Sequence, residues 1–187
     1  MKKVSYKVSL GGIIAALCLV LMFLTAVFPL LNMTLPLFAG MLITVVAVEV
    51  SCSWSFVTYA VVAILAFFVT PDKSAWLLFT FLFGIYPVEK LYFEKIKIKL
   101  LDILCRLAAF NVSVTVIAYL LMTLFGSVEL FEETLEMFDE LNLSREWIIP
   151  AMYIVGNLIF LLYDYTLTLV TACYIKWFRP TFLRKFK

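Results

Sequence analysis

The chain has 187 residues, of which 65% are hydrophobic and 15% charged, and its formal net charge is +2. Soluble domains are roughly 45–50% apolar, so this composition excludes a disordered chain, a nucleic-acid binder and an ordinary soluble enzyme. Six membrane spans of about 20 residues would use about 120 apolar-compatible positions. We therefore predict an all-α integral membrane bundle of six transmembrane helices that forms a single membrane domain, residues 1–187.

The first half of the sequence holds three predicted spans. No charged residue lies between Lys7 and Glu49, and that stretch is too long for one helix across an apolar core about 30 Å thick. Two prolines bracket a turn in its middle, so we predict helices over residues 8–28 and 35–48. A third apolar run covers residues 54–69 and ends in a Thr-Pro-Asp-Lys sequence.

The second half holds three further predicted spans and a long connection. The fourth span, residues 75–88, is short and contains a glycine and a proline, which predicts a kink. The fifth and sixth spans cover residues 100–125 and 147–177. The connection over residues 126–146 is strongly acidic, with apolar residues at helical spacing. It predicts either a short amphipathic helix at the outer face or a solvated spacer.

The distribution of basic residues predicts the orientation. Three lie before the first span, four in residues 90–99 and five in residues 176–187, against only Lys73 and Arg145 in the other connections. The first group of segments thus holds twelve basic residues and the other connections two. Under the positive-inside rule, this difference predicts that both termini lie in the cytoplasm. An even number of spans is then required, and six satisfies it.

Charged residues inside the predicted spans are informative because each is costly in lipid unless it is paired. Asp102 and Arg106 lie four residues apart on one helix face and can form an ion pair. Asp164 lies well inside the sixth span, and we predict Arg106 as its partner across the bundle. An ion-coupling carboxylate at position 164 is the alternative.

Two amides lie at similar predicted depths in the fifth and sixth spans. Asn111 and Asn157 would meet if these helices run in opposite directions. They then either hydrogen-bond each other or contact a ligand.

The predicted outer mouth carries two opposite charges beside an aromatic ring. Asp72 and Lys73 come shortly before Trp76, a set that could hold a small zwitterionic or heteroaromatic solute. The alternative is a helix-entry turn, with Asp72 as the cap.

The first span opens with small residues. Gly11 pairs with Ala15, and Gly12 with Ala16, at the four-residue spacing that lets another helix approach closely. The stripe predicts either internal packing or a docking surface for a partner helix.

Taken together, these features resemble a known family. A chain under 200 residues with six predicted spans, both ends inside, the stripe Gly12-Ile13-Ile14-Ala15-Ala16 and no nucleotide-binding motif resembles the substrate-binding S component of an energy-coupling factor (ECF) transporter. The segments Val69-Thr-Pro-Asp-Lys73 and Gly84-Ile-Tyr-Pro87 also look like those of small bacterial membrane proteins grouped near that family.

The resemblance implies a non-enzymatic subunit of the bacterial cell membrane that captures a vitamin-like micronutrient. It implies docking, through the first-helix stripe, on a transmembrane scaffold driven by ATP-binding subunits, with no metal and no cofactor. The positions that could contact the solute are Asn32, Asp72, Lys73, Trp76 and Asn157. Two alternatives remain open: a non-transporting scaffold of a cell-envelope complex, and a secondary carrier that uses Asp164 and Arg106.

Overall fold

The computed structural model describes residues 4–94, 96–124 and 145–178. Within these ranges the regular elements are all helical and no strand occurs, which confirms the all-α prediction. The long helices are α1 (Val4–Leu24), α2 (Thr34–Glu49), α3 (Cys52–Val69), α6 (Lys99–Leu124) and α8 (Arg145–Cys173). Two short elements are a 3₁₀ turn at Pro29–Leu31 and a π-helical end at Tyr174–Phe178. The predicted acidic connection, 126–146, lies outside the described residues except at its last two positions.

In the described part of the chain, four helices are long and apolar enough to cross a membrane. They are α1, α3, α6 and the stretch Pro150–Trp177, which contains most of α8. Helix α2 is apolar but shorter, with 16 residues. Large apolar side chains such as Phe68 and Leu162 lie exposed on the outer faces of these helices. Because water would not tolerate so much apolar surface, the arrangement is that of a membrane protein.

The fourth predicted span is helical but irregular. It consists of α4 (Lys73–Leu78), a π-helical segment (Phe79–Phe83) and α5 (Tyr86–Phe93), so the helical region continues five residues beyond the predicted end at 88. The amide of Gly84 donates to the carbonyl of Phe79 at 2.7 Å, a bond across five residues that marks the π turn.

A glycine on α2 allows this irregular segment to approach closely. A Cβ atom added to Gly40 would lie 2.1 Å from the carbonyl oxygen of Phe83. Such a distance is impossible for a real side chain, so only glycine lets α2 contact the π-helical segment at this point.

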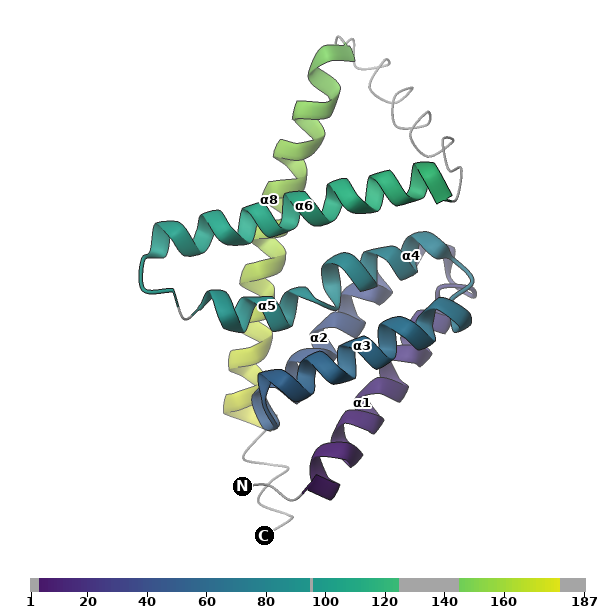
Figure 1. Ribbon diagram of the computed structural model, residues 1–187, viewed down its shortest axis with the longest axis vertical. Helices are drawn as coiled ribbons and strands as arrows, with labels where there is room; N and C mark the ends of the chain where they lie inside the picture. The colour runs from purple at the N-terminus through teal and green to yellow at the C-terminus, as the bar shows by residue number, and fades with distance from the viewer. Residues whose placement is uncertain (1–3, 95, 125–144, 179–187) are drawn as a thin grey trace.

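The buried residues form two clusters. One lies among α1, α2 and α3 and includes Cys18, Met22, Ile43 and Val62; the other joins α4, α5, α6 and α8. Figure 1 shows α8 crossing α5 and α6 rather than running beside them. The same view shows the α1–α2 and α3–α4 connections on the right-hand side of the molecule, together with the end of α6.

Candidate functional site

A largely shielded carboxylate on α8, that of Asp164, joins three helices. Asp164 Oδ1 accepts hydrogen bonds from Tyr86 Oη and Lys90 Nζ of α5, each at 2.5 Å. Arg106 Nη1 of α6 lies 3.0 Å from Asp164 Oδ2. The structure therefore brings together Arg106 and Asp164, the pair expected across the bundle.

Arg106 also forms an ion pair with the carboxylate of Asp102 on its own helix. Its Nε and Nη2 atoms donate to the two oxygens of Asp102 at 2.7 and 2.8 Å, a bidentate arrangement that the four-residue spacing allows. The guanidinium thus bridges Asp102 and Asp164. We call Lys90, Asp102, Arg106 and Asp164, with Tyr86, the charge network.

The charge network is electrically balanced and shielded. Its four charged side chains are only 6–19% exposed, and their two positive and two negative charges sum to zero. Desolvated charges are tolerated only when they are paired and hydrogen-bonded. The network meets that condition, and it ties α5, α6 and α8 together through side chains.

The sequence analysis did not assign Tyr86 or Lys90 to the network, and Lys90 is the charged one of the two. It was counted among the basic residues of the cytoplasmic connection, but it lies within α5 and is buried. Its Nζ also donates to the backbone oxygen of Asp164 at 2.7 Å and to Thr168 Oγ1 at 2.6 Å. Without Lys90, the predicted cytoplasmic segments hold eleven basic residues and the other connections two, so the predicted orientation is unchanged. The available signal was the four-residue spacing from Tyr86 to Lys90, which puts both polar ends on one helix face.

Aromatic rings cover one side of the network. Tyr86 packs edge-on against Phe160 with ring centroids 4.8 Å apart, and Phe160 stacks on Phe110 at 4.6 Å. These rings exclude water from the Tyr86 hydroxyl and strengthen its bond to Asp164. Among the described residues, no group of three or more cysteine, aspartate or glutamate side chains is placed to hold a metal ion.

The two membrane-depth amides bond each other where α6 and α8 cross. Asn111 Nδ2 donates to Asn157 Oδ1 at 3.1 Å, and Asn157 Nδ2 donates to Asn111 Oδ1 at 3.0 Å. Each amide also donates to the carbonyl four residues earlier, at 2.7 Å. Two roles were left open for Asn157, a hydrogen bond to Asn111 or contact with a ligand. The structure shows the hydrogen bond to Asn111.

The charged residues of the expected outer mouth connect α3 to α4. Asp72 caps α4 by accepting from the amide of Ser74 at 2.8 Å. Lys73 Nζ donates to the carbonyl of Phe67 in the last turn of α3 at 2.7 Å and to that of Thr70, the residue after α3, at 3.2 Å. A cation at this end suits the helix dipole.

Trp76 and Asn32, the other two expected contact residues, differ in whether their side chains make a hydrogen bond. Trp76 Nε1 donates to the carbonyl of Ala63 at 2.9 Å. Asn32 lies in the turn before α2, and its Oδ1 is buried without a hydrogen-bond partner in the described part of the chain. No hydrogen bond of the described residues joins Asn32 or Asn157 to Asp72, Lys73 or Trp76. Their common role as a solute site therefore stays a prediction.

The small residues of α1 divide between two environments. A Cβ atom on Gly11 would lie 3.1 Å from Thr58 Oγ1 of α3, whereas one on Gly12 would meet nothing within 4 Å. Ala15 is half-buried and Ala16 exposed. Gly11, Gly12 and Ala15 line one side of a shallow groove of about 220 Å³, and α3 lines the other side with Trp54, Val57, Thr58 and Val61. We call it the α1–α3 groove.

These elements define a helical protein of the membrane type, with a shielded charge network and a groove lined on one side by small residues. No protein-family model, curated protein or solved structure matches the chain.

Proposed function

We propose that this protein is the membrane-embedded capture subunit of a micronutrient uptake system, docked on a transmembrane scaffold that ATP-binding subunits drive. The chain would lie in a bacterial plasma membrane. In this proposal the protein binds the solute, and its partners supply the energy.

The α1–α3 groove carries this proposal. Its α1 side is lined by Lys7, Val8 and the small residues Gly11, Gly12 and Ala15. At the small residues, a neighbouring helix could approach the backbone of α1 closely. Gly12 has open space where its side chain would be, and Ala16 lies exposed one turn further on. Close backbone approach gives dispersion contacts that lipid tails cannot match. A partner helix is therefore favoured over lipid in this groove.

The proposal includes six spans with both termini in the cytoplasm. The spans would be α1, α2, α3, the α4-to-α5 region, α6 and α8. Helix α2 is about 24 Å long at 1.5 Å per residue, which calls for local thinning of the bilayer. Helix α8 has 29 residues and is about 43 Å long, enough to span while strongly tilted.

The docking is tested with two matched substitutions on exposed helical alanines. Ala16→Trp places a large ring on the small-residue stripe of α1, while Ala108→Trp places the same ring on the exposed face of α6. Each tagged variant is purified from native membranes in mild detergent, and co-purifying proteins are identified by mass spectrometry. We expect the unaltered protein and Ala108→Trp to recover a membrane partner and ATP-binding subunits, and Ala16→Trp to lose both.

Two results would count against the proposal. Equal recovery with Ala16→Trp would remove the docking role of α1. Recovery of cell-envelope proteins without any ATP-binding subunit would favour the non-transporting scaffold, which could use the same groove. Reporter fusions at residues 1 and 187 test the topology separately, because opposite locations would exclude an even number of spans.

A further inference from the structure

The charge network consists of two ion pairs, each of which is neutral by itself. Lys90 on α5 pairs with Asp164 on α8, and Arg106 pairs with Asp102 on α6. Arg106 Nη1 joins the two pairs, because it lies 3.0 Å from Asp164 Oδ2 and 3.1 Å from Asp164 Oδ1. If this contact opens, every charge keeps a partner of opposite sign. Opening therefore avoids the large cost of a buried charge without a partner.

The contact between α5 and α8 is built differently. Lys90 Nζ donates to Asp164 Oδ1, to the backbone oxygen of Asp164 and to Thr168 Oγ1, all on α8. An ammonium group has three donors, so Lys90 uses all of them on one helix. Separation of α5 from α8 would leave this shielded cation without a carboxylate. The network can therefore open between α6 and α8 at low cost, but not between α5 and α8.

The beginning of α6 has few other attachments to the bundle. None of the described residues 99–109 is buried, and the side chains of Leu100, Ile103 and Leu104 are 47–69% exposed. Leu107 is the apolar residue of this segment that packs against the cluster joining α4, α5, α6 and α8. We call residues 99–109 the α6 arm.

The middle of α6 is held more firmly than the arm. Phe110 and Ile117 are buried, and Asn111 and Asn157 bond each other in both directions. The amide pair therefore fixes α6 on α8 immediately beyond the arm. It provides a pivot about which the arm can tilt.

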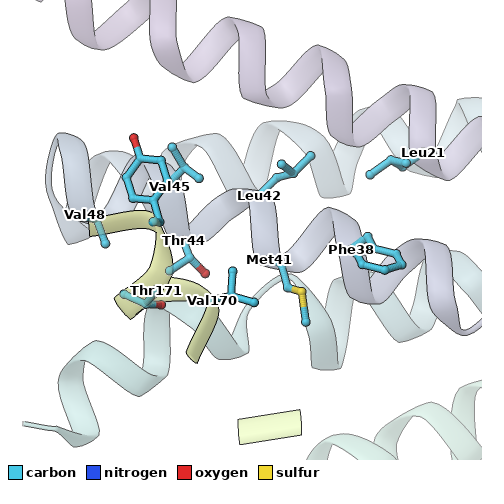
Figure 2. Close-up of a pocket in the computed structure, with 10 residues that line it drawn as sticks. Leu21, Phe38, Met41, Leu42, Thr44, Val45, Val48, Val170 and Thr171 are labelled. Carbon is cyan, nitrogen blue, oxygen red and sulfur yellow. The ribbon is translucent and has the colours of Figure 1, made fainter. Parts of the chain in front are cut away.

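Helix α8 depends on α5 at its end. An apolar cavity of about 450 Å³ lies between α2 and the end of α8, where Val170 and Thr171 line it (Figure 2). Close to this cavity, Leu167 is buried in the second cluster and Thr168 bonds Lys90. These contacts hold the end of α8 on the bundle, so we expect α5 and α8 to stay together.

We infer that the contact between Arg106 and Asp164 is a latch, and that its opening lets the α6 arm tilt away from α5 and α8, which stay together as one unit. The opening lies at the end of the bundle that is predicted to face the cytoplasm. A ligand or partner that favours the open state has only this contact to replace, because both ion pairs stay intact. The latch is separate from the α1–α3 groove, and the inference goes beyond the proposed docking function without depending on it.

The test measures distances between helices in the full chain in phosphatidylcholine nanodiscs. Spin labels are attached to p-acetylphenylalanine, so the native cysteines stay in place. One pair of labels, at the exposed positions Leu104 on α6 and Leu169 on α8, reports on the arm. The other pair, at Glu94 at the end of α5 and Leu169, reports on the unit of α5 and α8. Double electron–electron resonance gives the distance distribution of each pair.

The main variant removes one whole ion pair. Asp102→Asn combined with Arg106→Met opens the latch and leaves the other ion pair neutral. Leu104 lies seven residues before Asn111, which is about 10 Å along the helix, so a tilt of about 30° would move it by about 5 Å. We expect the mean distance between the labels at 104 and 169 to increase by this amount, and the distance between those at 94 and 169 to stay the same.

Two further variants serve as a milder change and a control. Arg106→Lys keeps the charge and the pairing with Asp102 but lacks the planar fork that reaches both carboxylates. It should shift the arm distance in the same direction by a smaller amount. Lys97→Gln removes an exposed charge just before the arm and should change neither distance.

Three results would overturn the inference. An unchanged arm distance in both Arg106 variants would show that other contacts hold the arm. An equal increase in both label pairs would show that α5 and α8 do not stay together. Failure of the main variant to fold, judged by its elution as a single species from a sizing column, would show that the network does not divide into two independent neutral pairs.

Discussion

Removing the charge of Asp164 should strongly destabilise the protein. Asp164→Asn keeps the size of the side chain but changes the sum of the network from zero to +1. Lys90, whose side chain is 6% exposed, then loses its anionic partner and is left with neutral acceptors, including the backbone oxygen of residue 164 and Thr168 Oγ1. Leaving a charge buried without its partner costs about 3–5 kcal/mol. We expect a loss of that size in the free energy of unfolding.

The measurement is equilibrium unfolding in mixed micelles of dodecylmaltoside and sodium dodecyl sulfate, followed by the fluorescence of the four tryptophans. The matched control is Asp72→Asn, because asparagine caps a helix about as well as aspartate. It should change the free energy of unfolding by less than ~0.5 kcal/mol.

A double variant separates the charge effect from general damage to the fold. Lys90→Met combined with Asp164→Asn restores neutrality and leaves the pair of Arg106 and Asp102 intact. We expect the double variant to lose less stability than either single variant, because no buried charge is left unbalanced. Losses that simply add in the double variant would refute the reasoning.

Three further predictions concern the packing of the helices. Gly40→Ala should lower the free energy of unfolding by about 1–3 kcal/mol through overpacking, because its Cβ would lie 2.1 Å from a backbone oxygen. Gly12→Ala should leave the free energy of unfolding unchanged in the same assay. Equal losses in the two variants would contradict this. Asn111→Leu should lower the free energy of unfolding by about 1–2 kcal/mol, because Asn157 loses its partner on α6. Replacing both amides should lower it less than replacing one. Asp72→Ala should lower the free energy of unfolding by about 1 kcal/mol through loss of the cap on α4. An unchanged midpoint of unfolding would show that this cap does not stabilise the protein.

The site could be predicted from the sequence only where few packing choices were open. Arg106 was expected to bond Asp164 because a buried carboxylate needs a cation and few were available within the spans. Lys90 was overlooked because it lies in a basic stretch beside a predicted span end. Its burial depends on α5 continuing to Phe93, which neither composition nor charge count indicates.

The sequence by itself determined the helical, apolar character of the chain and the pairing of Asp102 with Arg106. The reason is local: runs of apolar residues select helices in lipid, and a four-residue spacing fixes neighbours on one helix face. Tertiary structure alone decided that α8 crosses α6 and that Gly12 faces open space while Gly11 meets α3. These features depend on which helix faces meet, and partners such as Lys90 and Asp164 are 74 residues apart, so no local spacing encodes them.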